Sequence, residues 1–235
     1  MKVLGISTST PFGSVGLVDS DRVVGEYSLN LPITHAERLM TSIDRLLTDA
    51  GVPLSEVEGL SVTLGPGSFT GLRIGISTAK GLAFAMGLPV AGVSTLEALA
   101  LNVSNAAGEV CPILDARKKE VYAALFRVDF SHRVKRLTED MAVSPRALVE
   151  KIHGPVTFLG EGLEVYGGFL KRELGQQASF AGPELGYVRG SVVARMGVSL
   201  LARGKTLDLA TFVPRYVRRS EAEIRYEEGR GKQNR

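Results

Sequence analysis

The segment from residue 60 to residue 75 constrains the fold of this chain more than any other feature. Leu60–Leu64 is a short run of apolar and β-forming residues, which predicts a buried strand. Gly65-Pro66-Gly67 predicts a sharp turn, because glycine adopts backbone angles that other residues resist and proline fixes its own φ. A helical pattern then runs from Thr70 to Met86. This order places backbone N–H groups where a phosphate or carboxylate can bind.

The spacing of the glycines in this turn excludes two common phosphate-binding motifs. No Gly-Lys-Ser/Thr follows at the spacing of a Walker A loop. Gly65, Gly67 and Gly71 are one residue too widely spaced for the dinucleotide-binding fingerprint. The turn therefore points to another α/β fold with a glycine-rich strand-to-helix connection.

The predicted helix carries a small residue at every fourth position, at Gly71, Gly75, Ala79 and Ala83. Residues four apart share one helical face. Glycine inside a helix costs about 1 kcal/mol relative to alanine, so we expect another backbone to approach this face closely. Two interpretations remain open: the face packs on its own sheet, or it meets a partner helix.

Composition describes an ordinary globular protein. The 235 residues are 44% hydrophobic and 23% charged, enough for one two-lobed domain or two small ones. No apolar run approaches the ~20 residues of a membrane span, and the first residues are too short an apolar run for a signal peptide. The single cysteine, Cys111, allows no internal disulfide, and together these features favour the cytoplasm. Cys111 lies in an apolar run, which predicts a buried thiol. A net charge of +3 permits an acidic partner such as RNA without requiring one.

The predicted elements follow the order βββαβαβα, and a similar order begins again after Gly108. The first copy comprises strands 2–8, 14–18 and 23–29, helix 36–50, strand 60–64, helix 70–86, strand 89–93 and a helix opened by Ser94. The second comprises strands 110–114, 121–128 and 134–137, helix 145–152, strand 155–159, a helix to residue 174 and a last helix 191–202.

Residues 65–75 resemble the signature of the bacterial TsaB (YeaZ) family. Segments 3–10 with 14–18, 114–117 with 120–124, and 214–218 agree with the same family. The resemblance implies a two-lobed α/β fold like that of actin, Hsp70 and the sugar kinases, a ribonuclease H-like fold with a duplicated βββαβαβα unit. We expect a partner-binding N-terminal lobe at 1–108, a C-terminal lobe at 109–219 and a flexible charged tail at 220–235.

In that superfamily a nucleotide lies between the lobes, and the first hairpin of each lobe holds its phosphates. The resemblance implies no intrinsic cofactor, but it allows weak ATP or ADP binding at the lobe cleft or at a complex interface. An alternative interpretation makes Asp115 a turn residue and lets Gly160 and Gly162 simply end a strand. The candidate nucleotide-contacting residues are Ser7, Thr8, Gly13, Gly65, Gly67, Asp115, Gly160 and Gly162.

Groups needed for catalysis are missing from the expected positions. The related TsaD enzymes resemble this chain but hold a metal through two histidines spaced i, i+4, which lie on one helical face. Here His35 stands at the first position, but Leu39 at the second has no lone pair. Ser7 stands where ATP-splitting relatives carry a metal-organising aspartate. We therefore predict no metal site and no catalytic residue.

What the resemblance implies is a non-catalytic subunit of the bacterial machinery that makes threonylcarbamoyladenosine beside the anticodon of ANN-decoding tRNAs. Such a subunit binds the catalytic TsaD, with TsaE joining as an ATPase, and reaches tRNA only through the complex. We predict that helices 36–50 and 71–86 contact TsaD, or a second copy of this chain when TsaD is absent. The expected interface residues are His35, Leu39, Ile43, Gly71, Gly75, Ala79 and Ala83.

Rival functions remain open beside this one. An active actin-like ATPase or phosphotransferase, or a TsaD-like metal-dependent enzyme, needs an intact phosphate and metal site, against which Ser7 and Leu39 argue. A Rossmann dehydrogenase comes third. It is weakened by the glycine spacing and by the three strands before the first helix.

Overall fold

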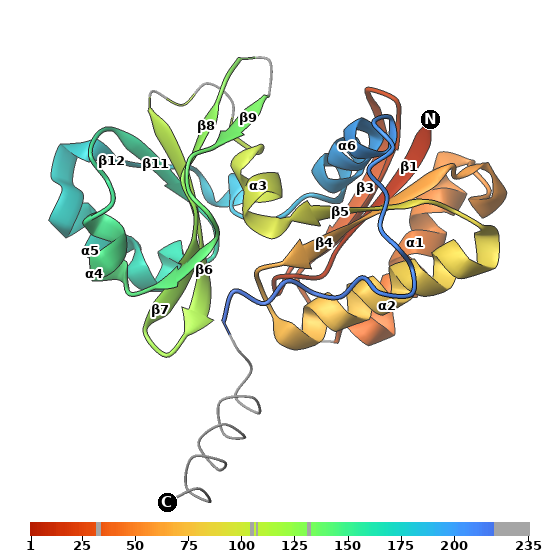
Figure 1. Cartoon of the computed structure of the whole chain (residues 1–235), viewed down its shortest axis with the longest axis horizontal. Coiled ribbons are helices and arrows are strands. Elements are labelled where there is room, and N and C mark those ends of the chain that lie inside the picture. Colours follow the sequence, from red (N-terminus) through yellow and green to blue (C-terminus); the bar gives the residue numbers. More distant parts are fainter. Residues whose placement is uncertain (32–33, 104–105, 107, 131–132, 219–235) are drawn as a thin grey trace, which may run out of the picture.

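Two mixed sheets stand side by side in the molecule (Figure 1). The structure is a computed structural model that describes residues 1–31, 34–103, 106, 108–130 and 133–218. The predicted tail at 220–235 lies outside the described residues. None of the described helices is both long and apolar enough to cross a bilayer.

The first sheet has the strand order β3-β2-β1-β4-β5. β1, β2 and β3 pair antiparallel, and β4 and β5 run parallel to β1. The parallel pairs need crossover connections, which α1 and α2 supply on one face of the sheet. The bounds are β1 (Lys2–Ser7), β2 (Gly13–Asp19), β3 (Arg22–Leu29), α1 (His35–Ala50), β4 (Gly59–Gly65), α2 (Phe69–Met86), β5 (Val90–Ser94) and α3 (Thr95–Ala100), with a 3-10 turn at Leu54–Glu56.

The second sheet has the order β10-β7-β6-β11-β12 and repeats the pairing pattern of the first, with two antiparallel pairs followed by two parallel pairs. A further hairpin, β8–β9, pairs with β6 off this path. The predicted duplication is thus present in the topology. The bounds are β6 (Glu109–Arg117), β7 (Glu120–Ala123), β8 (Phe126–Val128), β9 (Val134–Arg136), β10 (Met141–Val143), α4 (Pro145–Val149), β11 (Val156–Leu159), α5 (Leu163–Leu174), β12 (Ala178–Phe180) and α6 (Gly190–Leu201), with 3-10 turns at Gly175–Gln177 and Pro183–Leu185.

The strand predicted over residues 121–128 is two strands in the structure. β7 pairs with β10, whereas β8 pairs with the start of β6 and with β9, off the main strand order. The break falls at Leu125, whose N–H donates to the side chain of Thr138 (2.9 Å) instead of to a neighbouring strand. The third strand of the second sheet is therefore β10, and the segment predicted near 134–137 forms the outer strand of the extra hairpin.

The last helix, α6, covers the face of the first sheet opposite α1 and α2 (Figure 1). Its backbone comes very close to β1 and β2 because Gly5 and Gly16 have no Cβ; a Cβ on Gly5 would lie 2.2 Å from the carbonyl oxygen of Gly190. Ser14 Oγ and the Glu26 carboxylate accept hydrogen bonds from N–H groups at the start of α6. This packing corrects the expected C-terminal lobe at 109–219, because α6 joins the first half.

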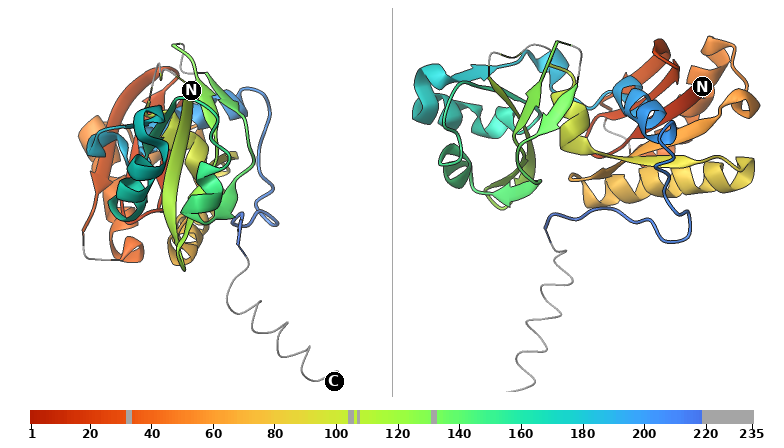
Figure 2. Two further views of the ribbon diagram at one scale, coloured as in Figure 1. Left: turned by 90° about the vertical axis from the view of Figure 1, so that its left-hand side faces the viewer. Right: turned by 45° about the horizontal axis from the view of Figure 1, so that its top comes forward.

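Residues 207–218, here called the C-terminal strap, also belong with the first sheet. Leu207 N–H donates to Val90 O (2.8 Å), and Arg215 N–H donates to Leu64 O (2.7 Å). The strap then passes α2 and ends beside the β6–β7 hairpin, as Figure 2 shows. There Arg218 Nη1 donates to Ala116 O (3.1 Å), which joins the two halves. The segment 214–218 singled out in the sequence is thus an inter-lobe connection.

Candidate functional site

The loop between β1 and β2, called here the first-hairpin loop (residues 8–12), is where the fold places one phosphate hairpin. Its hydroxyl groups are buried and engaged within the chain. Ser7 Oγ lies 3.2 Å from Ser9 Oγ, and Thr8 Oγ1 donates to Gly71 O (2.7 Å). These hydroxyls therefore already have protein partners.

The start of α2 packs directly on this loop. A Cβ at Gly71 would lie 2.0 Å from Thr8 O, and a Cβ at Gly75 would lie 2.3 Å from Thr8 Oγ1. The N–H of Ser68, the residue before the helix, donates to Ser9 O (2.8 Å). The glycines in α2 thus allow helix and loop to touch, and a backbone carbonyl accepts the hydrogen bond at the position where the sequence predicted an anion.

His35 and Arg38 hold the other side of the loop. His35 Nε2 donates to Thr10 O (2.9 Å), which leaves Nδ1 to accept from Arg38 Nη2 (3.0 Å). The same Nη2 donates to Pro11 O (2.9 Å). Burial lowers the pKa of His35; the bond to Thr10 opposes this shift and the charge of Arg38 reinforces it. The loop is thus fastened to α1 by a neutral imidazole and a guanidinium.

Arg38 was missed in the sequence, although its side chain is only 7% exposed. The available signal was its place in α1 between His35 and Leu39, next to the apolar stripe. Leu39 itself packs in the core of the first half and contributes no polar atom. Among the described residues, no group of three histidine, cysteine, aspartate or glutamate side chains could hold a metal ion.

The hollow beside the first-hairpin loop is too small for a phosphate group. Its volume is about 10 Å³, about the least that a single water molecule needs. This hollow therefore holds at most a single water molecule. The hollow is lined by Thr8, Gly13, Ser14, Val15, His35, Arg38, Leu39 and Ser42.

The remaining candidate nucleotide residues also contact the protein itself. The Asp115 carboxylate accepts from the N–H of Arg117 (2.8 Å) and pairs with its guanidinium (3.2 Å), which is the arrangement of a residue closing a turn. A Cβ at Gly160 would lie 2.2 Å from Ile113 O, and one at Gly162 would lie 3.1 Å from it. Similarly, Cβ atoms at Gly65 and Gly67 would meet Arg215 O (2.6 Å) and Ser9 O (2.2 Å).

The predicted partner residues mostly face inward. Together with His35 and Arg38, they form what we call the inward face of the α1–α2 pair. Of the two interpretations of the small-residue row, packing within the chain is the one that the structure shows. Leu39, Ile43, Gly71, Gly75, Ala79 and Ala83 are buried against the first sheet and its loop, and only His35 is partly exposed.

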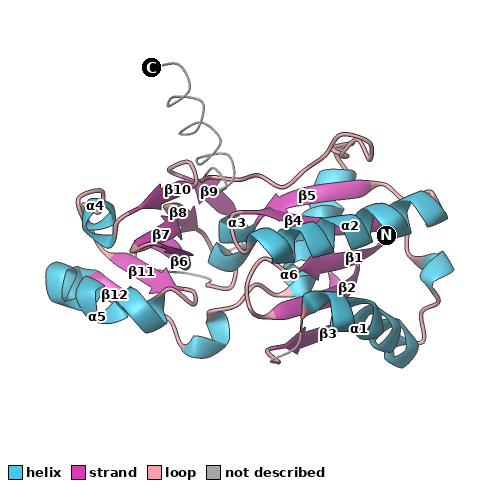
Figure 3. Cartoon of the chain, turned by 90° about the horizontal axis from the view of Figure 1, so that it is seen from below, coloured by secondary structure: helices cyan, strands magenta, loops and turns pink. Residues whose placement is uncertain are grey.

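The outward face of the same helix pair was missed in the sequence. Figure 3 shows α1 and α2 side by side on the near face of the first sheet. Phe84 is 86% exposed and Met40 is 51% exposed. The exposed residues of α2 also include a second small-residue row, at Ser77, Gly81 and Ala85, and no atom lies within 4 Å of a Cβ built at Gly81.

A hollow of about 310 Å³ reaches α2 at Leu82, the residue next to Gly81 in the chain. Its lining is largely apolar, and it is formed by the outer side of α1, the turn that follows it and one residue of α2. These lining residues are Met40, Ile43, Asp44, Leu47, Thr48, Gly51, Val52, Pro53, Leu54 and Leu82. We define the outward face as Met40, Asp44, Thr48 and Leu82 of this hollow together with Ser77, Gly81, Phe84 and Ala85. Ile43 also lines the hollow but belongs to the inward face.

Comparison with known proteins connects this geometry to a family. The family model "TsaD: tRNA N6-adenosine threonylcarbamoyltransferase" matches residues 32–226. The "tRNA threonylcarbamoyladenosine biosynthesis protein TsaB" of Bacillus subtilis is 31% identical over 229 residues, which are 96% of this chain and 98% of that protein.

Solved structures agree with this match. YeaZ from Pseudomonas aeruginosa superposes with a TM-score of 0.76 at 28% identity, covering 92% of this chain and 99% of that one. The ROK hexokinase of Thermus thermophilus, at 16% identity and a TM-score of 0.50 over 87% of this chain and 100% of that one, shares the fold alone. The chain therefore has the predicted actin-like, sugar-kinase-like fold, and it belongs to the TsaB (YeaZ) family of tRNA threonylcarbamoyladenosine biosynthesis proteins.

Proposed function

We propose that this chain is a non-catalytic subunit of the threonylcarbamoyladenosine machinery and binds a TsaD-type transferase through the outward face. The observation that carries this proposal is the contrast between the two faces of one helix pair. The inward face meets the chain's own loop, while the outward face presents Phe84 to solvent. A large exposed apolar side chain beside a hollow is typical of a protein-binding surface.

The small residues on α2 support a helical partner. Ser77, Gly81 and Ala85 are exposed and four residues apart, so another helix can approach the backbone of α2 closely. Phe84 can then insert into the partner, while the 310 Å³ hollow can receive a side chain from it. Because the sequence of this chain matches the family model of the transferase itself, the same face also suits a second copy of this chain when the transferase is absent.

The interface is tested by mixing the purified chain with the TsaD-type protein and measuring mass by size-exclusion chromatography with light scattering. Phe84→Ala should lower the affinity about 30-fold, since anchor residues contribute about 2 kcal/mol. Val165→Ala is the matched control, because Val165 is an exposed apolar residue on α5 in the other half. Equal affinities for the wild type and Phe84→Ala would contradict this interface.

Support for a non-catalytic role comes from the closed first-hairpin loop. Ser7 and Thr8 are engaged internally, and Arg38 stands beside His35. We expect no ATP hydrolysis by the purified chain above background. Turnover that is lost in Asp115→Ala would instead favour the rival actin-like ATPase.

The role in the pathway is tested by reconstitution with TsaC, TsaD, TsaE, ATP, threonine, bicarbonate and tRNA, followed by nucleoside mass spectrometry. We expect the modification to depend on this chain even though the transfer chemistry lies on TsaD. A misplaced catalytic group can lose about 100-fold in rate, so a subunit that only positions its partner can be required. Full modification without this chain would contradict the proposal.

A further inference from the structure

The β8–β9 hairpin carries like charges directly opposite each other. In its register Arg127 pairs with Lys135, and Val128 pairs with Val134. Phe126 and Val128 point into the core, whereas Arg127 and Lys135 are exposed. Like charges placed directly opposite on two strands destabilise a hairpin. This pair therefore has no explanation in the stability of the fold.

The cation that points inward on the same hairpin is treated differently by the chain. Arg136 lies 2.5 Å from Asp140 and 3.4 Å from Glu97, and its guanidinium stacks 4.8 Å from the ring centre of Phe126. The charge of Arg136, which packs against the core, is therefore neutralised by carboxylates. On the outward side, Arg127, Arg133 and Lys135 make no ion pair with any carboxylate among the described residues.

The same hairpin also carries an exposed aromatic ring. Phe130 follows β8 and is 79% exposed, the second most exposed large apolar side chain among the described residues. Asp129 is the single carboxylate that the described hairpin contributes, and its oxygen accepts from the backbone N–H of Arg133 (3.0 Å). We call Arg127, Phe130, Arg133 and Lys135 the basic hairpin face.

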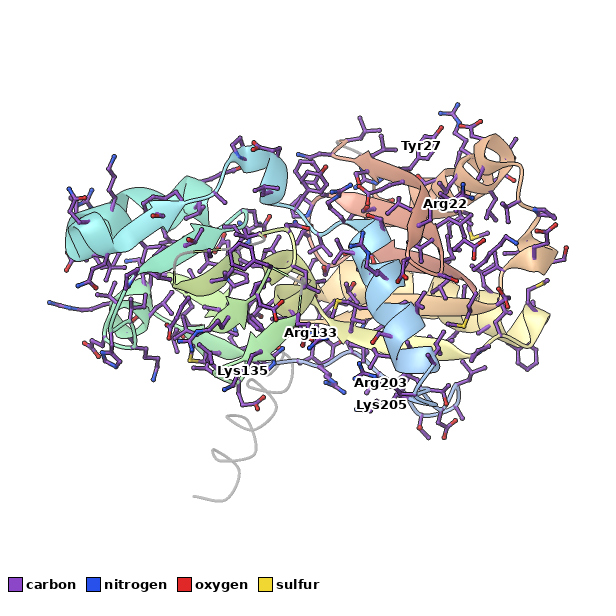
Figure 4. All side chains as sticks on the ribbon, turned by 90° about the horizontal axis from the view of Figure 1, so that it is seen from above. Arg22, Tyr27, Arg133, Lys135, Arg203 and Lys205 are labelled. Atoms are coloured by element: carbon purple, nitrogen blue, oxygen red, sulfur yellow. The ribbon has the colours of Figure 1, made fainter. Side chains whose placement is uncertain are left out.

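The positive surface continues onto the first half of the molecule. Arg203 and Lys205 lie in the turn after α6, and both are exposed. Figure 4 shows them on the same side of the molecule as Arg133 and Lys135. Neither makes an ion pair among the described residues.

We propose that the basic hairpin face, extended by Arg203 and Lys205, binds RNA directly. Cations without carboxylate partners attract a phosphate backbone, and an exposed ring offers a stacking surface for an unpaired base. An acidic protein would satisfy the cations but leaves the exposed Phe130 ring without a role. The RNA is a tRNA if the proposed function holds, and this identity alone rests on that function.

The position of the face allows it to act while the transferase is bound. α1 and α2 lie at the lower side of the first half in Figure 1, and the β8–β9 hairpin rises from the upper side of the second half. RNA contact and partner contact therefore use separate surfaces. This differs from the expectation that tRNA is reached only through other subunits.

The test measures binding of a fluorescent, unmodified tRNA transcript to the full chain by anisotropy over a range of salt concentrations. The double variant Arg133→Gln/Lys135→Gln should bind about tenfold more weakly, and the slope of log affinity against log salt should fall by about two. The matched control is Lys151→Gln/Arg172→Gln, which removes two exposed cations near α4 and on α5. It should bind like the wild type.

The aromatic side chain separates RNA from an acidic protein. Phe130→Ala should weaken binding about fivefold, as loss of one stacked base predicts, and should leave the salt slope unchanged. If Phe130→Ala has no effect and polyglutamate displaces the tRNA as well as unlabelled RNA does, the face binds acidic protein and the proposal is wrong. Unchanged binding in the double variant, an equal loss in the control, or no RNA binding by the wild type at low salt overturns it as well.

The outcome is separable from that of the proposed function. Arg133→Gln/Lys135→Gln should bind the TsaD-type partner normally by light scattering, whereas Phe84→Ala should lose the partner and still bind tRNA. If only the partner-binding results fail, the proposed RNA surface is unaffected. If only the RNA-binding results fail, the proposed partner surface is unaffected.

Discussion

The two faces of the α1–α2 pair show what a row of small residues does and does not indicate. On the inward face Gly71 and Gly75 touch Thr8 so closely that a Cβ would overlap it. On the outward face Gly81 has no neighbour within 4 Å of the position of a Cβ. In both rows the small residues are four positions apart in the sequence. The spacing alone therefore cannot say whether a small-residue row packs within the chain or remains open.

The largest effect is expected from adding a side chain where α2 touches the first-hairpin loop. Gly75→Leu would place a Cβ 2.3 Å from Thr8 Oγ1. The loop cannot easily move away, because Arg38 of α1 and Ser68 at the start of α2 both donate hydrogen bonds to its carbonyl groups. We expect a loss of about 3 kcal/mol or more in the free energy of unfolding, because overpacking a closed core forces backbone shifts. Urea denaturation measures this. A variant as stable as the wild type would show that the loop can move away.

The same substitution on the outward face should do the opposite to the isolated chain. Gly81→Leu removes a glycine from the middle of an exposed helix, which should stabilise the chain by about 0.5 to 1 kcal/mol. It should also weaken the complex with the TsaD-type partner about 30-fold, since a leucine there holds the partner helix away. Thermal denaturation and titration calorimetry give the two signs. A less stable chain that binds the partner with unchanged affinity would reverse the assignment of the faces.

Local signals in the sequence were sufficient for most elements of the first half. Thr34 and Glu37 predicted the start of α1, and both bonds of this capping box are present, with Gly51 ending the helix. β10 and β12 were missed; each is only three residues long.

Packing between segments far apart in the chain could not be predicted from the sequence. α6 was placed in the wrong half because its partners, Gly5 and Gly16, lie more than 170 residues away and give only an absence of side chain as a signal. The candidate site depends on contacts of the same kind. The spacing singled out the glycines, but their neighbours in the fold decide whether they contact a ligand or the loop.

Arg38 offers an intermediate test of the inward face. Its Nη2 donates to Pro11 O and to His35 Nδ1, while its buried Nε has no hydrogen-bond partner among the described residues. Arg38→Met keeps the apolar length of the side chain but leaves the loop carbonyl without this donor, so we expect a loss of about 1 to 2 kcal/mol in stability. Arg45→Met, at an exposed position of the same helix, is the control and should change stability little. Urea midpoints compare the two. Equal effects would mean that Arg38 does not fasten the loop.

The smallest effect concerns the protonation of His35. Burial lowers its pKa below the ordinary 6.5, so the unfolded chain binds a proton at this side chain more readily than the folded chain does. The contribution of neutral His35 to stability is then complete above pH 6.5 and is lost as the pH falls toward the lowered folded-state pKa. Protonating Nδ1 would also end its bond with Arg38 and place two cations together. His35→Gln cannot titrate, so its urea midpoint should fall less than that of the wild type over this range, and parallel pH profiles would contradict a neutral His35 at the loop.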